Sequence, residues 1–229
     1  MNKRLNIGIE LSVICISFLI LATGCKKDDN NDSTLVADID GNIYHTVTIG
    51  TQVWMVENLM TTRFNDGTAI PLVTGIESWE NNSSSGYTWY DNEITNKTPY
   101  GALYNWFTAK QSNLCPPGWH VPTDTEWTTL TDYLGGEIIA GGKLKEAGTT
   151  HWIDPNADGT NECGFTALAG GSRHIDGTFS DKGETAFWWT STVYNTYYAW
   201  YRYVYYSNGN VSRNNWDARN GFSVRCVKN

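Results

Sequence analysis

The clearest pattern of hydrophobic and polar positions lies in the middle of the chain. Residues 118–121 form a short extended run, and Pro122 disfavours helical angles at the residue before it. Thr123 and Glu126 have the spacing of a capping box, in which each side chain bonds the backbone N–H of the other residue. The apolar residues that follow recur at helical spacing: Trp127, Leu130 and Leu134. The glycines at 135–136 favour a helix end, so the pattern predicts a strand and then an amphipathic helix that begins at Thr123.

Alternating and aromatic-rich segments predict strands in both halves of the chain. The runs 44–49 and 52–56 flank the turn residues 50–51 and indicate a hairpin in which Trp54 and Val56 face inward. Three later runs are bounded by Asn, Gly or Ser and predict an antiparallel sheet: 187–192, 199–206 and 221–227. No tandem repeat recurs at a fixed spacing, which excludes solenoids and propellers.

The segments between these elements have weak periodicity. Residues 61–99 are rich in Asn, Ser, Thr and Gly and are expected to form a long ordered loop. Residues 102–110 predict a short helix with Leu103 and Trp106 as apolar anchors. Leu144 is an isolated apolar residue among glycines and charges, so its segment is expected to lie mostly at the surface. Strands and helices in separate segments indicate an α+β domain.

The N-terminal residues have the layout of a secretory signal peptide, expected over 1–24. The apolar run 11–21 is too short to span a bilayer comfortably. Gly24 and Cys25 resemble a lipoprotein cleavage site, so Cys25 is expected to be acylated, with cleavage without lipidation as the alternative. Residues 25–35 are polar and predict a flexible tether. The composition of a globular domain begins at Val36 and covers residues 36–229.

Net charge limits the partners. The chain carries a formal charge of −8, and removal of the signal peptide leaves the remainder slightly more acidic. An acidic surface repels phosphate backbones, whose binding depends on Lys and Arg. Nucleic acid is therefore not expected as a partner.

Several blocks in a fixed order carry a resemblance to known families. The stretch from Gly118 to Trp127 resembles the Gly-Trp-x-x-Pro-Thr-x-x-Glu-Trp signature of C-type-lectin-like folds, a group that includes the formylglycine-generating (sulfatase-modifying) enzymes. Further blocks cover nearly the whole domain: Asp40-Gly41-Asn42, Ile49 to Leu59, Tyr100-Gly101, Leu103 to Trp106, Gly164 to Leu168, Gly170-Gly171 and Gly221 to Val227. Together they resemble the Fibrobacter succinogenes major paralogous domain family, a set of secreted or lipid-anchored proteins of Fibrobacter and Bacteroidota.

The resemblance implies a fold, a location and a disulfide. The expected fold is α+β and C-type-lectin-like, with small antiparallel sheets, one or two short helices and long ordered loops. The expected location is the outer membrane, reached through the lipid anchor, with exposure at the cell surface left open. The three cysteines of residues 36–229 allow one pair and one remaining thiol. Because lectin-like folds commonly tie their final strand to the rest of the domain, the implied pair is Cys115 with Cys226, and Cys163 is expected to be a buried thiol.

Metal-binding and catalytic signals are weak. Asp154, Asn156, Asp158 and Gly159 match the first half of a calcium loop, but Phe165 stands where a bidentate glutamate belongs. Calcium binding there is left open against a plain turn. The four histidines have neither metal-ligand spacing nor a nucleophile motif: His45, His120, His151 and His174. We expect no catalytic residue, resident metal or cofactor.

A ligand-binding face is predicted near the last strands. Alternation over residues 199–206 puts three tyrosines on one side of the strand and Trp200, Arg202 and Val204 on the other. Either one side is an open aromatic platform for sugars, or both sides are core and the polar loops are solvated. Four loop residues form the candidate ligand-binding set: Tyr194, Tyr197, Asn208 and Asn214.

The expected function is recognition of glycans or surface proteins by a non-enzymatic cell-envelope lipoprotein. The alternative is a structural component of the envelope or extracellular matrix that binds no small ligand. An enzyme of the sulfatase-modifying type is less expected, because its chemistry needs a closely spaced cysteine pair, and Cys163 and Cys226 lie far apart in the sequence.

Overall fold

The helix predicted from the capping box is present. The computed structural model describes residues 35–229, and α4 (Asp124–Tyr133) follows the N-cap residue Thr123. Glu126 N–H donates to Thr123 Oγ1 at 3.2 Å, and Thr123 N–H donates to Glu126 Oε2 at 2.7 Å. A cap of this kind stabilises a helix by about 1 kcal/mol.

A second helix, α5 (Glu137–Leu144), follows after the glycines at 135–136, which have φ of 104° and 99°. Leu144 is fully buried, so the prediction that this segment lies mostly at the surface is wrong. The reason is the pair of glycines at 141–142. They let α5 approach two loops so closely that a Cβ at either position would collide with loop backbone.

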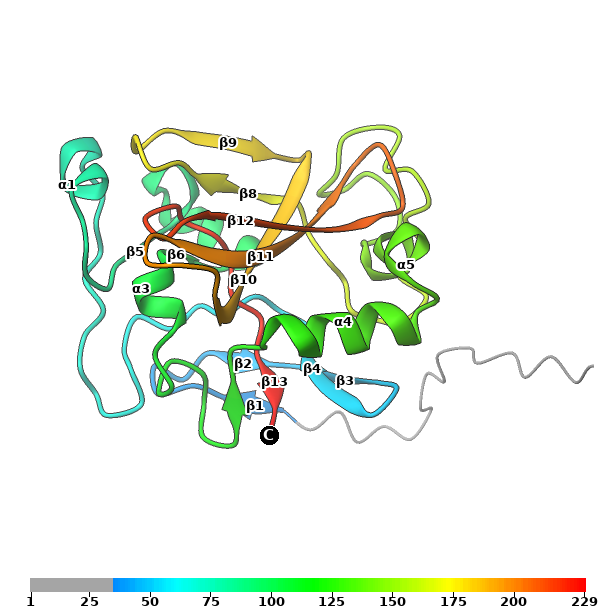
Figure 1. Ribbon diagram of the computed structural model, residues 1–229, viewed down its shortest axis with the longest axis horizontal. Coiled ribbons are helices and arrows are strands. Elements are labelled where there is room, and N and C mark those ends of the chain that lie inside the picture. Colours follow the sequence, from blue (N-terminus) through cyan, green and yellow to red (C-terminus); the bar gives the residue numbers. More distant parts are fainter. Residues whose placement is uncertain (1–34) are drawn as a thin grey trace, which may run out of the picture.

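The largest sheet has five strands in the order β12, β11, β10, β8 and β9 (Figure 1). Their bounds are Gly170–Arg173 for β8, Phe179–Lys182 for β9, Thr185–Val193 for β10, Tyr198–Tyr205 for β11 and Val211–Asp217 for β12. All neighbours are antiparallel except β8 and β10, which are parallel. β12 is therefore an edge strand, and β10 and β11 lie inside the sheet.

A second sheet joins the two ends of the described chain, in the order β3, β4, β13 and β7. Its strands are Thr46–Ile49 for β3, Gln52–Met55 for β4, Trp119–His120 for β7 and Val227–Lys228 for β13. The β3–β4 hairpin confirms the prediction from runs 44–49 and 52–56. Trp54 is fully buried as predicted, but the fully buried residue beside it is Met55, whereas Val56 is half-buried.

Residues 61–99 are less loop-like than predicted, although their elements are short. They contain α1 (Ile76–Glu80), β5 (Tyr87–Thr88), η1 (Tyr90–Asn92) and η2 (Ile94–Asn96), and α2 (Lys97–Tyr100) follows. The predicted helix over 102–110 is reduced to α3 (Trp106–Ala109), because Leu103–Tyr104 is strand β6 and pairs with β5. Asn105 caps α3 by accepting from the N–H of Thr108 at 3.1 Å. A final two-stranded pair is β1 (Val36–Ala37) with β2 (Ile43–Tyr44).

The predicted last strand is mostly irregular. Within 221–227 only Val227 belongs to a strand, β13, while Gly221, Phe222 and Ser223 form single bridges to three different segments. The chain crosses here from the larger sheet to the smaller one, so it cannot pair continuously with either. The fold is α+β, with small antiparallel sheets, short helices and long loops.

The core contains a cluster of tryptophans whose rings are tilted against one another. The ring centre of Trp127 in α4 lies 5.0 Å from that of Trp54 in β4 and 5.4 Å from that of Trp188 in β10, so it contacts a strand of each of the two larger sheets. Phe165 contacts all three rings. The helix predicted from sequence therefore joins both sheets into one core.

A fully buried arginine lies beside this core. Asn58 Oδ1 accepts from Arg225 Nε at 3.1 Å, from Arg225 Nη2 at 2.9 Å and from Trp188 Nε1 at 2.9 Å. Arg225 Nη1 also donates to Phe165 O, and the guanidinium lies 4.1 Å from the Phe165 ring centre. Burial lowers the pKa of Arg225 to about 9. The neutral oxygen of one asparagine thus receives three hydrogen bonds in the interior.

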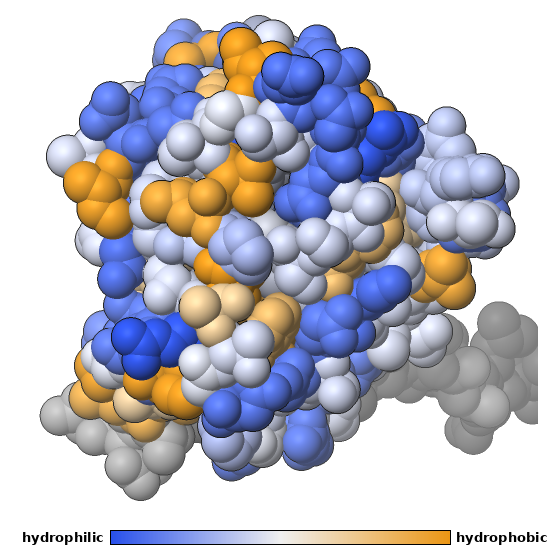
Figure 2. Space-filling model, turned by 90° about the vertical axis from the view of Figure 1, so that its left-hand side faces the viewer, coloured by the Kyte–Doolittle hydropathy of each residue, from blue (hydrophilic) through white to orange (hydrophobic). Residues whose placement is uncertain are grey.

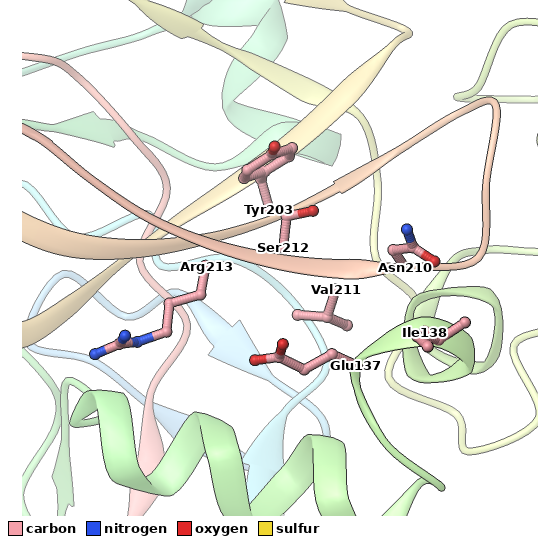
Figure 3. A pocket seen from close by; sticks show the side chains of 7 residues that line it. All are labelled: Glu137, Ile138, Tyr203, Asn210, Val211, Ser212 and Arg213. Atoms are coloured by element: carbon pink, nitrogen blue, oxygen red, sulfur yellow. The ribbon is translucent and has the colours of Figure 1, made fainter.

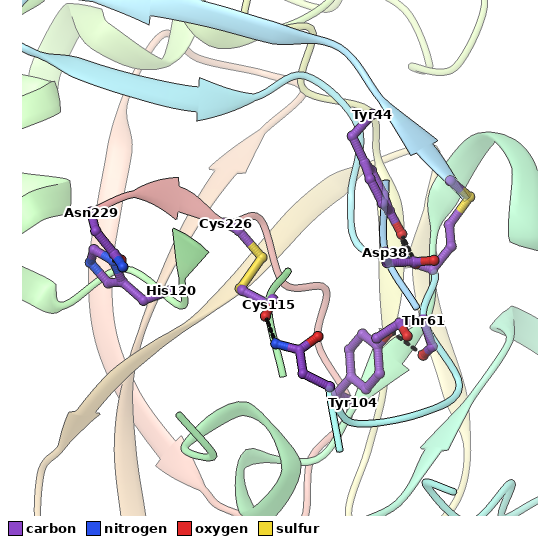
Figure 4. The surroundings of a disulfide bond; sticks show 10 residues. Asp38, Tyr44, Thr61, Tyr104, Cys115, His120, Cys226 and Asn229 are labelled. Atoms are coloured by element: carbon purple, nitrogen blue, oxygen red, sulfur yellow. Dashed lines mark hydrogen bonds between the residues drawn. A yellow bond between two sulfur atoms is a disulfide. The ribbon is translucent and has the colours of Figure 1, made fainter. Parts of the chain in front are cut away.

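The disulfide that the resemblance implies joins Cys115 to Cys226 (Figure 4). It connects the turn before β7 to the residue before β13, and 111 positions separate its two cysteines. Nearby, His120 of β7 makes a 2.7 Å hydrogen bond to the side chain of Asn229. Cys163 is a buried thiol, as predicted, with Sγ 3.2 Å from Lys143 O.

The predicted signal peptide (1–24), the predicted lipidation site Cys25 and all but the last residue of the predicted tether (25–35) lie outside the described residues. Within residues 35–229, none of the helices has the length and apolar character needed to cross a membrane.

Candidate functional site at the tip of a hairpin

The strand faces of β10 and β11 are mainly core. Trp188, Trp189, Arg202 and Val204 are almost fully buried, and so is Tyr201. Burial raises the pKa of Tyr201 well above its usual range. The tyrosines at 203 and 205 are half-buried. The alternative in which both faces are core therefore describes these strands better than an open row of rings.

Three of the exposed aromatic side chains lie instead at the tip of the β10–β11 hairpin, next to the exposed Val193. The exposed fractions are 55% for Val193, 50% for Tyr194, 70% for Tyr197 and 39% for Tyr198. The tip is held by hydrogen bonds. Tyr194 N–H donates to Tyr198 O at 2.9 Å, and Asn195 Oδ1 accepts from the N–H groups of Tyr197 and Tyr198 at 2.9 and 3.0 Å. Three tyrosines are thus displayed on an ordered turn.

Two further side chains extend this surface along the sheet. The Trp200 ring meets the Tyr194 ring edge-on at 4.9 Å between centres. The guanidinium of Arg213, on the neighbouring strand β12, lies over Trp200 at 3.4 Å from its centre. We call the group Tyr194, Tyr197, Tyr198, Trp200 and Arg213 the tip surface.

The predicted ligand-binding set does not form one site. Tyr194 and Tyr197 lie together at the tip, but Asn208 lies in the turn at the opposite end of β11. A strand of this length extends over about 25 Å, so Asn208 is far from the tip. Asn214 is exposed on β12 but is adjacent in sequence to Arg213, so its side chain points to the other face of the sheet. Its Oδ1 is also occupied by the N–H of Asn215.

Sequence reasoning missed Trp200 and Arg213 as members of the site. Their contact depends on the register of β12 on β11, which pairs Trp200 with Asn215 and Arg202 with Arg213. β12 itself was not predicted, because its sequence Val-Ser-Arg-Asn-Asn-Trp-Asp has no clear alternation. The available signal was the turn Ser207 to Asn210, which is typical of a hairpin that returns along β11.

A shallow hollow runs along β12 beside the tip surface (Figure 3). It is lined by Glu137, Ile138, Tyr203, Asn210, Val211, Ser212 and Arg213. Figure 3 shows Tyr203 and Ser212 on one side of the strand and Arg213 on the other, reaching toward the start of α4. The hollow follows the open edge of the sheet, and Arg213 belongs both to its lining and to the tip surface.

The segment that matches the first half of a calcium loop packs against a buried lysine. Lys145 is fully buried, and its Nζ donates to Ala157 O at 2.6 Å, Asn208 O at 2.9 Å and Tyr205 O at 3.1 Å. Burial lowers its pKa to about 8, an effect opposed by the charge of Asp158. Asn156 Nδ2 donates to two backbone carbonyls, those of Glu146 and Gly148. The ammonium of Lys145 thus ties this loop, through Ala157 O, to the carbonyls of Tyr205 and Asn208.

The four histidines lie apart and contact different partners: Glu57 for His45, Glu126 and Asn229 for His120, Glu146 for His151, and Ser180 for His174. Ser180 lies 2.7 Å from His174 Nε2 and donates to Asp181 Oδ2 at 2.5 Å. This differs from a catalytic triad, in which the carboxylate accepts from the histidine. Among the described residues, no group of three or more His, Cys, Asp or Glu is placed to hold a metal ion.

These features define an α+β domain with an internal disulfide and three exposed tyrosines on one hairpin tip. The sequence matches the model of the Fibrobacter succinogenes major domain family over residues 47–228. The chain therefore belongs to this family. Comparison with curated proteins and with solved structures gives no match.

Proposed function

We propose that the domain is a non-enzymatic recognition module that binds glycans through the tip surface. The observation that carries this proposal is the display of Tyr194, Tyr197 and Tyr198 on a turn fixed by hydrogen bonds and anchored in buried strands. Tyrosine offers large contact area at low conformational cost, and its ring packs on apolar sugar faces while its hydroxyl meets polar edges. An ordered tip also reduces the entropy lost on binding.

A relationship to C-type-lectin-like folds is part of this proposal. It is supported by the meeting of both ends of the domain in one sheet, where β13 lies between β4 and β7. The disulfide that ties Cys226 to Cys115 supports it as well. Other surface proteins are a second class of ligand for the same tyrosines, since such side chains are enriched at protein interfaces.

Alanine at the tip should abolish glycan binding without loss of stability. Tyr197→Ala and Tyr194→Ala remove exposed rings, so each should change the free energy of unfolding by about 0.5 kcal/mol or less. On a glycan array, each should lose the signal that the parent protein gives. Asn214→Ala is the matched control on the other face and should keep that signal. Full binding by both tyrosine variants would move the recognition surface elsewhere.

The structural alternative rests on a separate observation. On the side of the molecule that carries α1, apolar side chains occur in small groups separated by polar ones (Figure 2). Together with the buried strand faces, this distribution favours a structural component of the envelope that binds no small ligand. A blank array would support this reading over glycan recognition. The sulfatase-modifying chemistry is disfavoured further because Cys226 is already in a disulfide.

We also propose that acylated Cys25 anchors the protein in the outer membrane. Cys25→Ser should move the protein from the detergent phase to the aqueous phase in detergent partitioning, since burial of acyl chains supplies the anchor. The acidic chain, with a net charge of −8, gains little attraction to anionic lipid. Continued partitioning of Cys25→Ser into detergent would contradict lipidation and favour a retained apolar segment.

A further inference from the structure

The tip surface contains a cation whose position is fixed by two contacts. Arg213 stacks on Trp200 at 3.4 Å from the ring centre, and its Nε donates to Asp124 Oδ2 at 2.8 Å. The first contact sets the plane of the guanidinium, and the second sets its rotation within that plane. Among the hydrogen bonds of the described residues, neither Nη of Arg213 donates to protein. Its side chain is 39% exposed, so these N–H groups are available to a ligand.

Two carboxylates, Asp124 and Glu137, balance the charges of Arg202 and Arg213, but the Nη groups of Arg213 have no hydrogen-bond partner among the described residues. Arg202, which is fully buried, pairs with Asp124 at 2.9 Å and with Glu137 at 3.0 Å. Asp124 is therefore shared between two guanidinium groups, and Glu137 faces Arg202. Asp124 directs one oxygen to each arginine, Oδ1 to Arg202 and Oδ2 to Arg213. A further anion would thus find Arg213 held in place, with its outer donors unpaired.

An apolar ring lies within reach of the same cation. Arg213 covers the face of Trp200, and Tyr194 meets that indole edge-on at 4.9 Å between ring centres. Because both groups contact one indole, they lie within the length of a disaccharide. Tyr194 is half exposed, whereas the face of Trp200 under Arg213 is covered. A sugar would therefore pack on tyrosine and meet the arginine at one end.

We propose that the tip surface selects acidic sugars, with the carboxylate of a uronic acid accepting hydrogen bonds from both Nη groups of Arg213. A planar guanidinium matches the two oxygens of a carboxylate, and hydrogen bonds between charged partners are stronger than those to a neutral hydroxyl. This inference rests on the proposed function and names the class of glycan.

The test compares acidic oligosaccharides with their own neutral forms. Hyaluronan, alginate and oligogalacturonate fragments would each be titrated calorimetrically into the purified protein, beside the same fragments after reduction of the carboxyl groups. A sulfated galactan fragment would separate sulfate from carboxylate recognition. The variants would be Arg213→Gln, Arg213→Lys and, as control, Arg219→Gln, which removes a partly exposed arginine paired with Asp217 and leaves Trp200 untouched.

We expect at least one acidic fragment to bind about tenfold more tightly than its reduced form, the value for a charge-assisted pair. Arg213→Gln should remove this ratio, Arg213→Lys should keep part of it, and Arg219→Gln should leave it unchanged. Equal affinity for acidic and reduced fragments would overturn the inference and leave glycan recognition standing. A preference for the sulfated fragment would also overturn it, and so would absence of binding to every fragment, in which case the glycan array decides whether glycan recognition itself stands. If Arg213→Gln fails to fold, the ratio of affinities for acidic and reduced fragments, measured on the parent protein, still shows whether acidic sugars are selected.

Discussion

Replacement of Asn58 by leucine is expected to lower the free energy of unfolding by about 3 to 5 kcal/mol. Asn58 Oδ1 is the acceptor for two N–H groups of Arg225 and for the indole N–H of Trp188. All three residues are buried. Leucine has a similar size but no acceptor, so a guanidinium would stay in the interior with only the carbonyls of Phe165 and Thr166 as partners.

The measurement is urea unfolding followed by tryptophan fluorescence. Asn81→Leu is the matched control, because Asn81 is an exposed asparagine that bonds only locally to Glu77. It should change stability by about 1 kcal/mol or less. If Asn58→Leu and Asn81→Leu unfold at similar urea concentrations, the buried charge of Arg225 does not depend on Asn58 for its stabilisation.

Loss of the disulfide should have the second large effect. Replacing both Cys115 and Cys226 with alanine should lower stability by up to about 4 to 5 kcal/mol, because the bond closes a loop of more than 100 residues in the unfolded chain. The chain-entropy model gives an upper value, since the unfolded chain without the bond retains some structure. The double variant should therefore unfold at a much lower urea concentration than the parent protein.

Reductant provides the control for this effect. It should shift the unfolding midpoint of the parent protein toward that of the double variant and leave the double variant unchanged. Non-reducing peptide mapping should show Cys115 linked to Cys226 and Cys163 alkylated only after unfolding, because Cys163 is buried. A linked peptide that contains Cys163, or equal midpoints with and without reductant, would contradict this account.

Elements with local chemical signals were predictable from the sequence. The capping box of Thr123 and Glu126 and the turn around Gly50 each act within a few residues, so α4 and the β3–β4 hairpin follow from their own segments. The disulfide was implied by family resemblance, because three cysteines alone leave three pairings open.

Elements stabilised by distant partners were not predictable. β12 is polar and acquires its strand form by pairing with β11, and α5 packs only because its glycines admit two distant loops. The same limit explains the site. Tyr194 and Tyr197 are adjacent through one turn and were found together, whereas Arg213 reaches Trp200 only through the β11–β12 register. Asn208 and Asn214 were included because polar loop residues look alike until a face of the sheet is assigned.

Recognition at the hairpin tip is tested most directly by NMR. An oligosaccharide that binds on the array is titrated into the protein, and the shifts of its backbone amide signals are followed. We expect the largest shifts on residues 193–200 and on Arg213, with small shifts at Asn208 and Asn214. Tyr197→Ala should remove these shifts while the spectrum of the core is retained. Shifts centred on another surface, or a spectrum unchanged by every oligosaccharide that the array identifies, would contradict recognition at the hairpin tip.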